Sequence, residues 1–214
     1  AIFLGKQSIE IREIDRPTIT SGEILLRVKS CAICSTDIRI IRGEKSRGVR
    51  VPSILGHEVS GEIAEVGSEV LTFKEGDQVA IAPVIPCKSC YYCMKGMENI
   101  CLNRTAIGYE YDGGMAEYMR VPAQAIRLGN VIEISDSLSY DEASLLEPLA
   151  CCINSIRKAK VGLNSVVVII GAGPMGLMHL CLSKRAGAAQ VIVSELLEGR
   201  RRLAQKFGAD ICVD

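Results

Sequence analysis

The spacing of apolar residues differs between the two ends of the chain. In the N-terminal part, apolar residues alternate with polar ones over short stretches, as at Ile24, Leu26 and Val28. Glycines separate these stretches at Gly22, Gly56, Gly61, Gly67, Gly76 and Gly113–Gly114. Alternation with a period of two between glycine turns predicts half-buried strands, and many short strands of this kind predict a β-barrel or sandwich.

From residue 141 onward, the pattern predicts longer helices and a different kind of strand. Residues 141–158 have helical spacing, and residues 166–170 form a continuous apolar run that is typical of a buried parallel strand. Further along, the pattern predicts a helix at 174–185, a strand at 190–194, a helix at 197–207 and a strand at 210–213. This βαβαβ order is half of a doubly wound fold and places the domain boundary near residues 150–160.

Composition and charge exclude several classes of function. The 214 residues are 48% hydrophobic and 23% charged, which is ordinary for a globular protein. Lysine and arginine together number 25, as do aspartate and glutamate, so no overall field would attract nucleic acid or an anionic membrane. No apolar run approaches the roughly 20 residues that span a bilayer, and the N-terminus lacks the pattern of a signal peptide. We therefore expect a soluble, cytoplasmic protein.

Four of the ten cysteines lie close together in the sequence. Cys87, Cys90, Cys93 and Cys101 form a C-x2-C-x2-C-x7-C motif. Four thiolates complete a tetrahedral zinc shell and leave no position for substrate, so the motif predicts a structural zinc site. An iron–sulfur cluster is the main alternative, while four unrelated thiols would be unusual at this density.

A second set of residues has the chemistry of a zinc site with an open position. Cys34, His57, Glu58 and Glu147 are thiol, imidazole and carboxylate side chains that all suit zinc. Three protein ligands would leave room for water or an alcohol. Each residue alone also has an ordinary structural explanation, since a histidine after a glycine is usually structural and a glutamate before a proline often ends a strand.

A glycine motif follows the predicted strand at 166–170. Gly171, Gly173 and Gly176, with Pro174 and Met175 between them, open the next predicted helix. Such glycines allow a tight turn and bring a pyrophosphate close to the helix N-terminus.

The end of the next predicted strand indicates which dinucleotide this motif would bind. Glu195 lies nineteen residues beyond Gly176, where a carboxylate would bind the ribose 2′-hydroxyl and repel the extra phosphate of NADP. Arg200, Arg201 and Arg202 are the counter-argument, because arginines near this point can hold that phosphate. They begin a turn into the following predicted helix, so the sequence favours NAD over NADP.

Taken together and in order, these motifs resemble the zinc-containing medium-chain alcohol dehydrogenases, in particular their sorbitol and threonine dehydrogenase branch. The resemblance covers the whole chain and rests on Cys34-x-Thr36-Asp37, Gly56-His57-Glu58-x-x-Gly61, Gly76-Asp77-x-Val79, the four cysteines, Gly113-Gly114-x-Ala116-Glu117-Tyr118, Glu147-Pro148 and the glycine motif. It implies a GroES-like β-barrel catalytic domain at residues 1–152 and the first half of a Rossmann NAD-binding domain at 153–214. A homodimer or homotetramer is the usual assembly that it implies for the full-length protein.

The resemblance also assigns roles to individual residues. It implies that Cys34 and His57 ligate a catalytic zinc, with Glu58 and Glu147 as candidates for the remaining ligand. Asp37 would hold the ring of His57, and Thr36 would begin a proton relay from the alcohol. Many relatives end that relay at a histidine five residues after the zinc cysteine, where this chain has Arg39. Because a guanidinium is not a base near neutral pH, the relay must end differently here.

The function implied is hydride transfer from a small secondary alcohol or a sorbitol-like polyol to NAD. Alternatives are an L-threonine or sugar-alcohol-phosphate dehydrogenase, or a truncated zinc-binding module without activity. The segment 39–50 bears on this choice, because it carries Arg39, Arg42, Lys45, Arg47 and Arg50 against Glu44 alone. An exposed polar loop is the simplest interpretation, and attraction of a phosphorylated substrate is the other.

Overall fold

The computed structural model describes residues 1–214, and its internal contacts divide the chain into two compact units. The first is Ala1–Glu147 and the second is Pro148–Asp214. The sequence analysis placed the change of domain after residue 152. The observed division falls a few residues earlier, inside the first turn of helix α5 (Leu146–Lys158).

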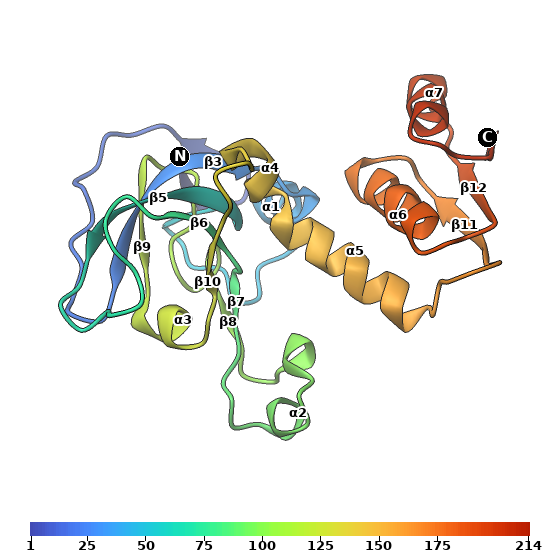
Figure 1. Cartoon of the computed structure of the whole chain (residues 1–214). Helices are drawn as coiled ribbons and strands as arrows, with labels where there is room; N and C mark the ends of the chain where they lie inside the picture. Colours follow the sequence, from blue (N-terminus) through green and yellow to red (C-terminus); the bar gives the residue numbers. More distant parts are fainter. The chain divides into compact units, whose positions relative to one another are not determined.

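The first unit is built on an antiparallel five-stranded sheet with the order β10-β6-β5-β3-β9 (Figure 1). Its strands are β3 (Ile24–Ala32), β5 (Glu58–Val66), β6 (Gln78–Ile81), β9 (Tyr118–Val121) and β10 (Val131–Glu133). Ile24 and Leu26 are fully buried and pack with Val59, Ile63 and Met119. Leu25 between them is fully buried as well, so the predicted alternation of buried and exposed positions does not hold at the start of β3. The GroES-like β-domain expected from the sequence is therefore present.

Short elements surround this sheet. A three-stranded sheet has the order β2-β1-β4, and a separate two-stranded ladder pairs β7 with β8. These strands are β1 (Ile2–Gly5), β2 (Ser8–Glu10), β4 (Ser53–Ile54), β7 (Val84–Ile85) and β8 (Thr105–Ala106). The short helices are α1 (Ser35–Ile41), α2 (Tyr91–Met94), the 3-10 turn Glu98–Ile100, α3 (Ala123–Arg127) and α4 (Tyr140–Ser144). Figure 1 shows the segment that carries α2 projecting from the ends of β7 and β8 as a separate lobe.

The second unit has the predicted βαβαβ order. After α5 come β11 (Val166–Ile170), α6 (Pro174–Arg185), β12 (Gln190–Ser194), α7 (Glu198–Lys206) and β13 (Ile211–Val213). The three strands are parallel in the order β11-β12-β13. This is the partial Rossmann fold that the sequence predicts, and the bounds of β11, α6 and β12 agree residue for residue. No helix of the chain is long and apolar enough to cross a membrane.

The helical stretch predicted at 141–158 is two helices, because α4 ends before α5 begins at Leu146. Ser139 caps α4: its hydroxyl accepts the N–H of Glu142, and the carboxylate of Glu142 accepts the N–H of Ser139. Pro148 has no N–H to donate and is tolerated only in the first turn of a helix. Glu147 therefore lies at a helix start and does not end a strand, which was the structural alternative considered for it.

The prediction of a buried strand at 166–170 is wrong for one face of that strand. Val166, Val168 and Ile170 are 62%, 62% and 88% exposed, whereas Ile169 is buried. The core of this unit gathers Ile169, Leu180, Val191, Val193 and Ala204 on the face that α6 and α7 cover. A continuous apolar run is typical of sheets with helices on both faces. Here only one face of β11 is covered. The apolar residues of the other face have no helix packed against them.

Candidate metal centres and cofactor loop

The first candidate centre begins at the N-terminus of α1. Cys34 is the N-cap residue, and its sulfur accepts the Thr36 N–H at 3.4 Å. The carboxylate of Asp37 accepts the Cys34 N–H at 2.9 Å, so the two side chains cap the helix reciprocally. Asp37 is completely buried. This local capping holds the thiol and the carboxylate side by side.

Pairing between β3 and β5 brings His57 to the same place. Ala32 pairs with Glu58 at the end of the ladder, so residues just after β3 face residues just before β5. Gly56 has φ +96°, and a Cβ there would lie 2.7 Å from the sulfur of Cys31. Only glycine fits this backbone conformation and space, so Gly56 permits the turn that delivers His57. His57 and Glu58 are both buried, at 5% and 6% exposure.

The ligating atoms of Cys34, His57 and Glu58 all lie within 4.8 Å of one another. Sulfur, nitrogen and carboxylate oxygen in this arrangement are a donor set that fits zinc. The Oδ1 of Asp37 lies 3.4 Å from Nδ1 of His57, and neither atom is placed to form a hydrogen bond. The contact is thus chiefly electrostatic at this distance. It orients the imidazole and leaves its other nitrogen for a metal ion.

The charges within this cluster are strongly coupled. Burial opposes a charged His57, but Asp37 and Cys34 outweigh it and raise the pKa of His57 to about 10. The hydrogen bond to His57 in turn lowers the pKa of Cys34. Burial raises the pKa of Glu58, and the charge of Glu147 raises it further. A cation in this cluster would relieve the repulsion between the carboxylates and stabilise the thiolate.

The other predicted residues lie around this cluster. Thr36 Oγ1 is 3.5 Å from the sulfur of Cys34. Glu147 is half-buried in the first turn of α5, near enough to influence Glu58, but it is outside the group of three ligand atoms. Arg39 forms an exposed ion pair with Glu44 at 3.7 Å.

The sequence analysis missed Tyr109. Its ring lies 5.4 Å from the imidazole of His57, centroid to centroid. Burial, followed by the nearby charges of Asp37 and Cys34, raises the pKa of Tyr109, so its hydroxyl stays protonated at neutral pH. A lone tyrosine after a glycine carries no sequence signal for this position. It is delivered by the turn after β8, far from Cys34 along the chain.

The second candidate centre is the lobe that carries α2. The sulfurs of Cys90 and Cys93 are 3.5 Å apart, those of Cys87 and Cys93 4.0 Å, and those of Cys90 and Cys101 3.9 Å. Four sulfurs at about 2.3 Å from one zinc ion would be separated by roughly 3.8 Å, so this geometry fits tetrahedral zinc. The N–H groups of Cys87 and Cys90 point at the sulfurs of Cys101 and Cys87, both at 3.3 Å.

Hydrogen bonds prepare part of this lobe for metal binding. The N–H and hydroxyl of Ser89 lower the pKa of Cys87 to about 5, whereas burial raises the pKa of Cys93. The lysines of the lobe are engaged elsewhere, since Lys88 pairs with Glu98, and Lys95 lies 5.8 Å from the centre of the Tyr91 ring. Backbone donors therefore take the larger part in stabilising the thiolates.

The glycine motif forms the turn between β11 and α6. Gly171 has φ +94°, and a Cβ on Gly176 would lie 2.0 Å from the carbonyl oxygen of Gly171. Gly173 is the N-cap of α6 and has no side chain to accept the first N–H groups. Pro174 occupies the first turn, where its missing N–H is harmless. Met175 follows it and is 42% exposed. The helix thus begins with free donors, as a pyrophosphate site requires.

Glu195 links this turn to the end of β12. One of its carboxylate oxygens accepts the N–H of Ala172 at 2.8 Å, and the other accepts the N–H of Leu197 at 2.9 Å. These two backbone donors lower the pKa of Glu195 and keep it charged. Arg200 approaches it at 3.8 Å, and Arg201 donates to the carbonyl of Glu195. A fixed negative charge therefore stands at the position expected to meet the adenosine ribose.

Comparison with known proteins agrees with this geometry. A family profile described as "Alcohol dehydrogenase GroES-like domain" matches residues 20–130, more than half of the chain. An L-threonine 3-dehydrogenase of Pyrococcus furiosus is 38% identical over 207 residues, which are 96% of this chain and 58% of the relative. The chain belongs to the zinc-containing medium-chain alcohol dehydrogenase family.

Other members of the family are similar over nearly the whole chain. A D-altritol 5-dehydrogenase of Agrobacterium fabrum is 36% identical over 99% of this chain and 62% of its own length. A structure from Sinorhizobium meliloti described as a zinc-binding dehydrogenase bound to NADP superposes with a TM-score of 0.90 at 34% identity. The superposition includes 100% of this chain and 61% of the Sinorhizobium meliloti chain. The chain thus spans about three fifths of the length of these medium-chain dehydrogenases.

Proposed function

We propose that the protein of which this chain is part is a zinc-dependent dehydrogenase that transfers hydride from a small secondary alcohol or polyol to NAD. The observation that carries the proposal is the convergence of Cys34, His57 and Glu58 within 4.8 Å in one buried cluster. The chain also carries a second group of candidate ligands, which consists of four cysteines. The alcohols in the names of the relatives, threonine and altritol, both offer a secondary hydroxyl to such a centre.

Each residue of the cluster has a defined task in this proposal. Cys34, His57 and Glu58 hold the catalytic zinc, and Glu147 is the alternative carboxylate if Glu58 moves away. When bound, zinc supplies a Lewis acid that lowers the pKa of an alcohol, and the nicotinamide accepts the hydride. Asp37 orients His57 and favours the tautomer with its free nitrogen toward the metal.

The alcohol proton leaves through Thr36 in this proposal. Its hydroxyl is 3.5 Å from the sulfur of Cys34 and accepts the proton as a hydrogen bond from the substrate. Arg39, which pairs with Glu44, supplies no base for the next step. The neutral hydroxyl of Tyr109 lies near that of Thr36 and helps to orient the substrate. The proton passes from Thr36 to water.

The cofactor preference follows from Glu195. Its charged carboxylate, fixed by two N–H donors, accepts hydrogen bonds from a ribose with two free hydroxyls and repels a 2′-phosphate. Arg200 and Arg201 are engaged by Glu195 through its carboxylate and its carbonyl. The Sinorhizobium meliloti relative was solved with NADP, so the choice is tested directly by comparing NAD with NADP. We expect NAD to bind at least tenfold more tightly, and Glu195→Gln to reduce this ratio.

The decisive experiment measures zinc and NADH together. Zinc-loaded protein is offered sorbitol, galactitol and threonine with NAD, and NADH is followed at its absorbance maximum. We expect two zinc ions per chain and turnover that disappears in Cys34→Ala, which keeps one zinc ion. Retention of one zinc ion with no turnover in the unaltered chain would favour the alternative of a zinc-binding module without activity.

A further inference from the structure

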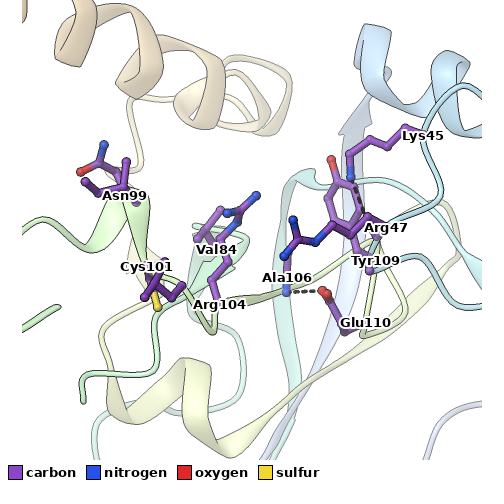
Figure 2. Close-up of a pocket in the computed structure, with 12 residues that line it drawn as sticks. Lys45, Arg47, Val84, Asn99, Cys101, Arg104, Ala106, Tyr109 and Glu110 are labelled. Carbon is purple, nitrogen blue, oxygen red and sulfur yellow. Dashed lines mark hydrogen bonds between the residues drawn. The ribbon is translucent and has the colours of Figure 1, made fainter. Parts of the chain in front are cut away.

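A cavity of about 540 Å³ lies next to Tyr109 in the first unit. Its wall is formed by the loop before β4, the segment that follows Asn99 and the turn after β8 (Figure 2). Cavities of this volume are typical of small-molecule sites. Its cationic lining residues are Lys45, Arg47 and Arg104, and its only acidic lining residue is Glu110.

The three cations form no salt bridge with a carboxylate. By contrast, Arg39 of α1 pairs with Glu44, and Arg50 pairs with Asp112. Lys45, Arg47 and Arg104 take part in none of the eleven salt bridges of the chain. Their positive charge is therefore available to a ligand.

Contacts within the cavity hold the groups that carry this charge. Glu110 accepts the Ala106 N–H at 2.8 Å, so one of its oxygens is already used. Lys45 donates to the carbonyl of Arg47 at 3.5 Å. Burial, followed by the charge of Arg104, lowers the pKa of Lys45, and the nearby carboxylate of Glu110 offsets part of this shift. An anion would offset this repulsion.

The cavity adjoins the cluster of Cys34, His57 and Glu58 through one ring. The Lys45 ammonium lies 4.0 Å from the centre of the Tyr109 ring, and this ring lies 5.4 Å from the imidazole of His57. A ligand held by Lys45 is therefore separated from the zinc cluster by about the thickness of one side chain. A linear polyol of five or six carbons is long enough to reach across this distance.

We propose that this cavity binds the phosphoryl group of a phosphorylated polyol whose secondary hydroxyl lies at the zinc cluster. The proposal rests on the function proposed above and names its substrate class. A phosphate monoester carries up to two negative charges and three terminal oxygens, which matches two guanidinium groups and one ammonium. Arginine binds such oxygens in pairs, and lysine adds a point charge. A carboxylate, with one charge and two oxygens, would leave part of this positive charge unmatched.

The test compares ligands on the zinc-loaded chain by titration calorimetry. Sorbitol 6-phosphate, sorbitol, inorganic phosphate and threonine are titrated into the unaltered chain and into the variants Lys45→Gln, Arg47→Gln and Arg104→Gln. Arg42→Gln is the matched control, since it removes an exposed charge from the same loop outside the cavity. Circular dichroism and the melting temperature of each variant report whether it remains folded.

We expect sorbitol 6-phosphate to bind at least tenfold more tightly than sorbitol. Each substitution in the cavity should reduce the affinity for the phosphate ester by about tenfold and leave that for sorbitol unchanged. Arg42→Gln should change neither. Equal affinities for sorbitol and its phosphate, an equal loss in Arg42→Gln, or a preference for threonine would each overturn the proposal. Inorganic phosphate binding as tightly as the ester would also overturn it, because the polyol would then contribute nothing.

Cys34→Ala separates this inference from the proposed function. This variant should lose NADH formation while it keeps the difference in affinity between sorbitol 6-phosphate and sorbitol. If the full-length protein binds the ester selectively but never forms NADH, the proposed function fails and the phosphate site stands. If it oxidises sorbitol and its phosphate equally well and binds them equally, the function stands and the phosphate site fails.

Discussion

The two candidate metal centres of this chain are assembled in opposite ways. The four cysteines of the α2 lobe lie within residues 87–101, and short turns with their own N–H donors bring the sulfurs together. Cys34, His57 and Glu58 meet only because β3 pairs with β5 and because α1 begins directly after β3. The four-cysteine centre depends on local spacing, whereas the Cys34 centre depends on the register of the sheet.

The two centres also differ in how deeply they are buried. The lobe exposes much of its surface, with Tyr91, Met94 and Leu102 all exposed, and it contributes no residue to the main β-domain core. His57 and Glu58 are buried at the start of β5, and Asp37 is completely buried. We therefore expect the lobe to depend on its metal for folding, and the Cys34 cluster to keep its shape without one.

The largest effect should come from breaking the lobe. Cys93→Ser removes a buried ligand, so the lobe should lose its zinc ion. Structural zinc binding contributes on the order of 10 kcal/mol to folding in small zinc modules, and little else holds this segment together. Limited proteolysis should then cut between residues 87 and 101 while the β-domain remains intact. Cys181→Ser is the control, and equal protease resistance in both variants would contradict the idea.

His57→Ala should have a smaller and differently placed effect. The substitution should remove the zinc ion of the Cys34 cluster and abolish turnover, because the two remaining ligands, Cys34 and Glu58, do not hold the metal. The lobe should stay resistant to protease, and the melting temperature should fall only by the loss of one buried side chain. Zinc content by mass spectrometry under native conditions checks this. Loss of both zinc ions would show that the two centres fold as one unit.

Gly56→Ala should weaken the Cys34 cluster through the backbone. Its positive φ and the 2.7 Å approach to the Cys31 sulfur leave no room for a methyl group. Strain and steric overlap together should lower the free energy of unfolding by about 2–4 kcal/mol. Denaturant titration measures this loss. Gly96→Ala is the control in the lobe, where φ is also positive and a Cβ meets nothing within 4 Å.

The smallest effect should come from Asp37→Asn. An amide oxygen still accepts the Cys34 N–H, so the helix cap survives, but the negative charge beside His57 is lost. Zinc affinity of this centre should fall about 10- to 100-fold, or about 1.4–2.7 kcal/mol, as is usual when the partner of a ligating histidine is changed. Competition with a coloured chelator gives the affinity. Asp136→Asn, an exposed substitution, should leave it unchanged.

The local parts of this molecule were predictable because local chemistry decides them. The bounds of β11, α6 and β12 follow from apolar periodicity, the glycine turn and Pro174. The spacing of the four cysteines was enough to predict that their sulfurs lie together. The exposure of one face of β11 was not predictable. An apolar run indicates that both faces of a strand can be packed against, but it does not show whether a packing partner is present.

The sequence by itself identified most of the candidate site residues: the thiols, His57, the carboxylates and the glycines of the cofactor turn. Tertiary structure alone decided which of them meet. The register of β3 with β5 selects Glu58 for the cluster with Cys34 and His57 and leaves Glu147 outside it. The packing of loops in the first unit likewise places Tyr109 against His57 and brings Lys45, Arg47 and Arg104 to one cavity. Distances between residues far apart in the chain are fixed by packing and strand pairing, and no local pattern encodes them.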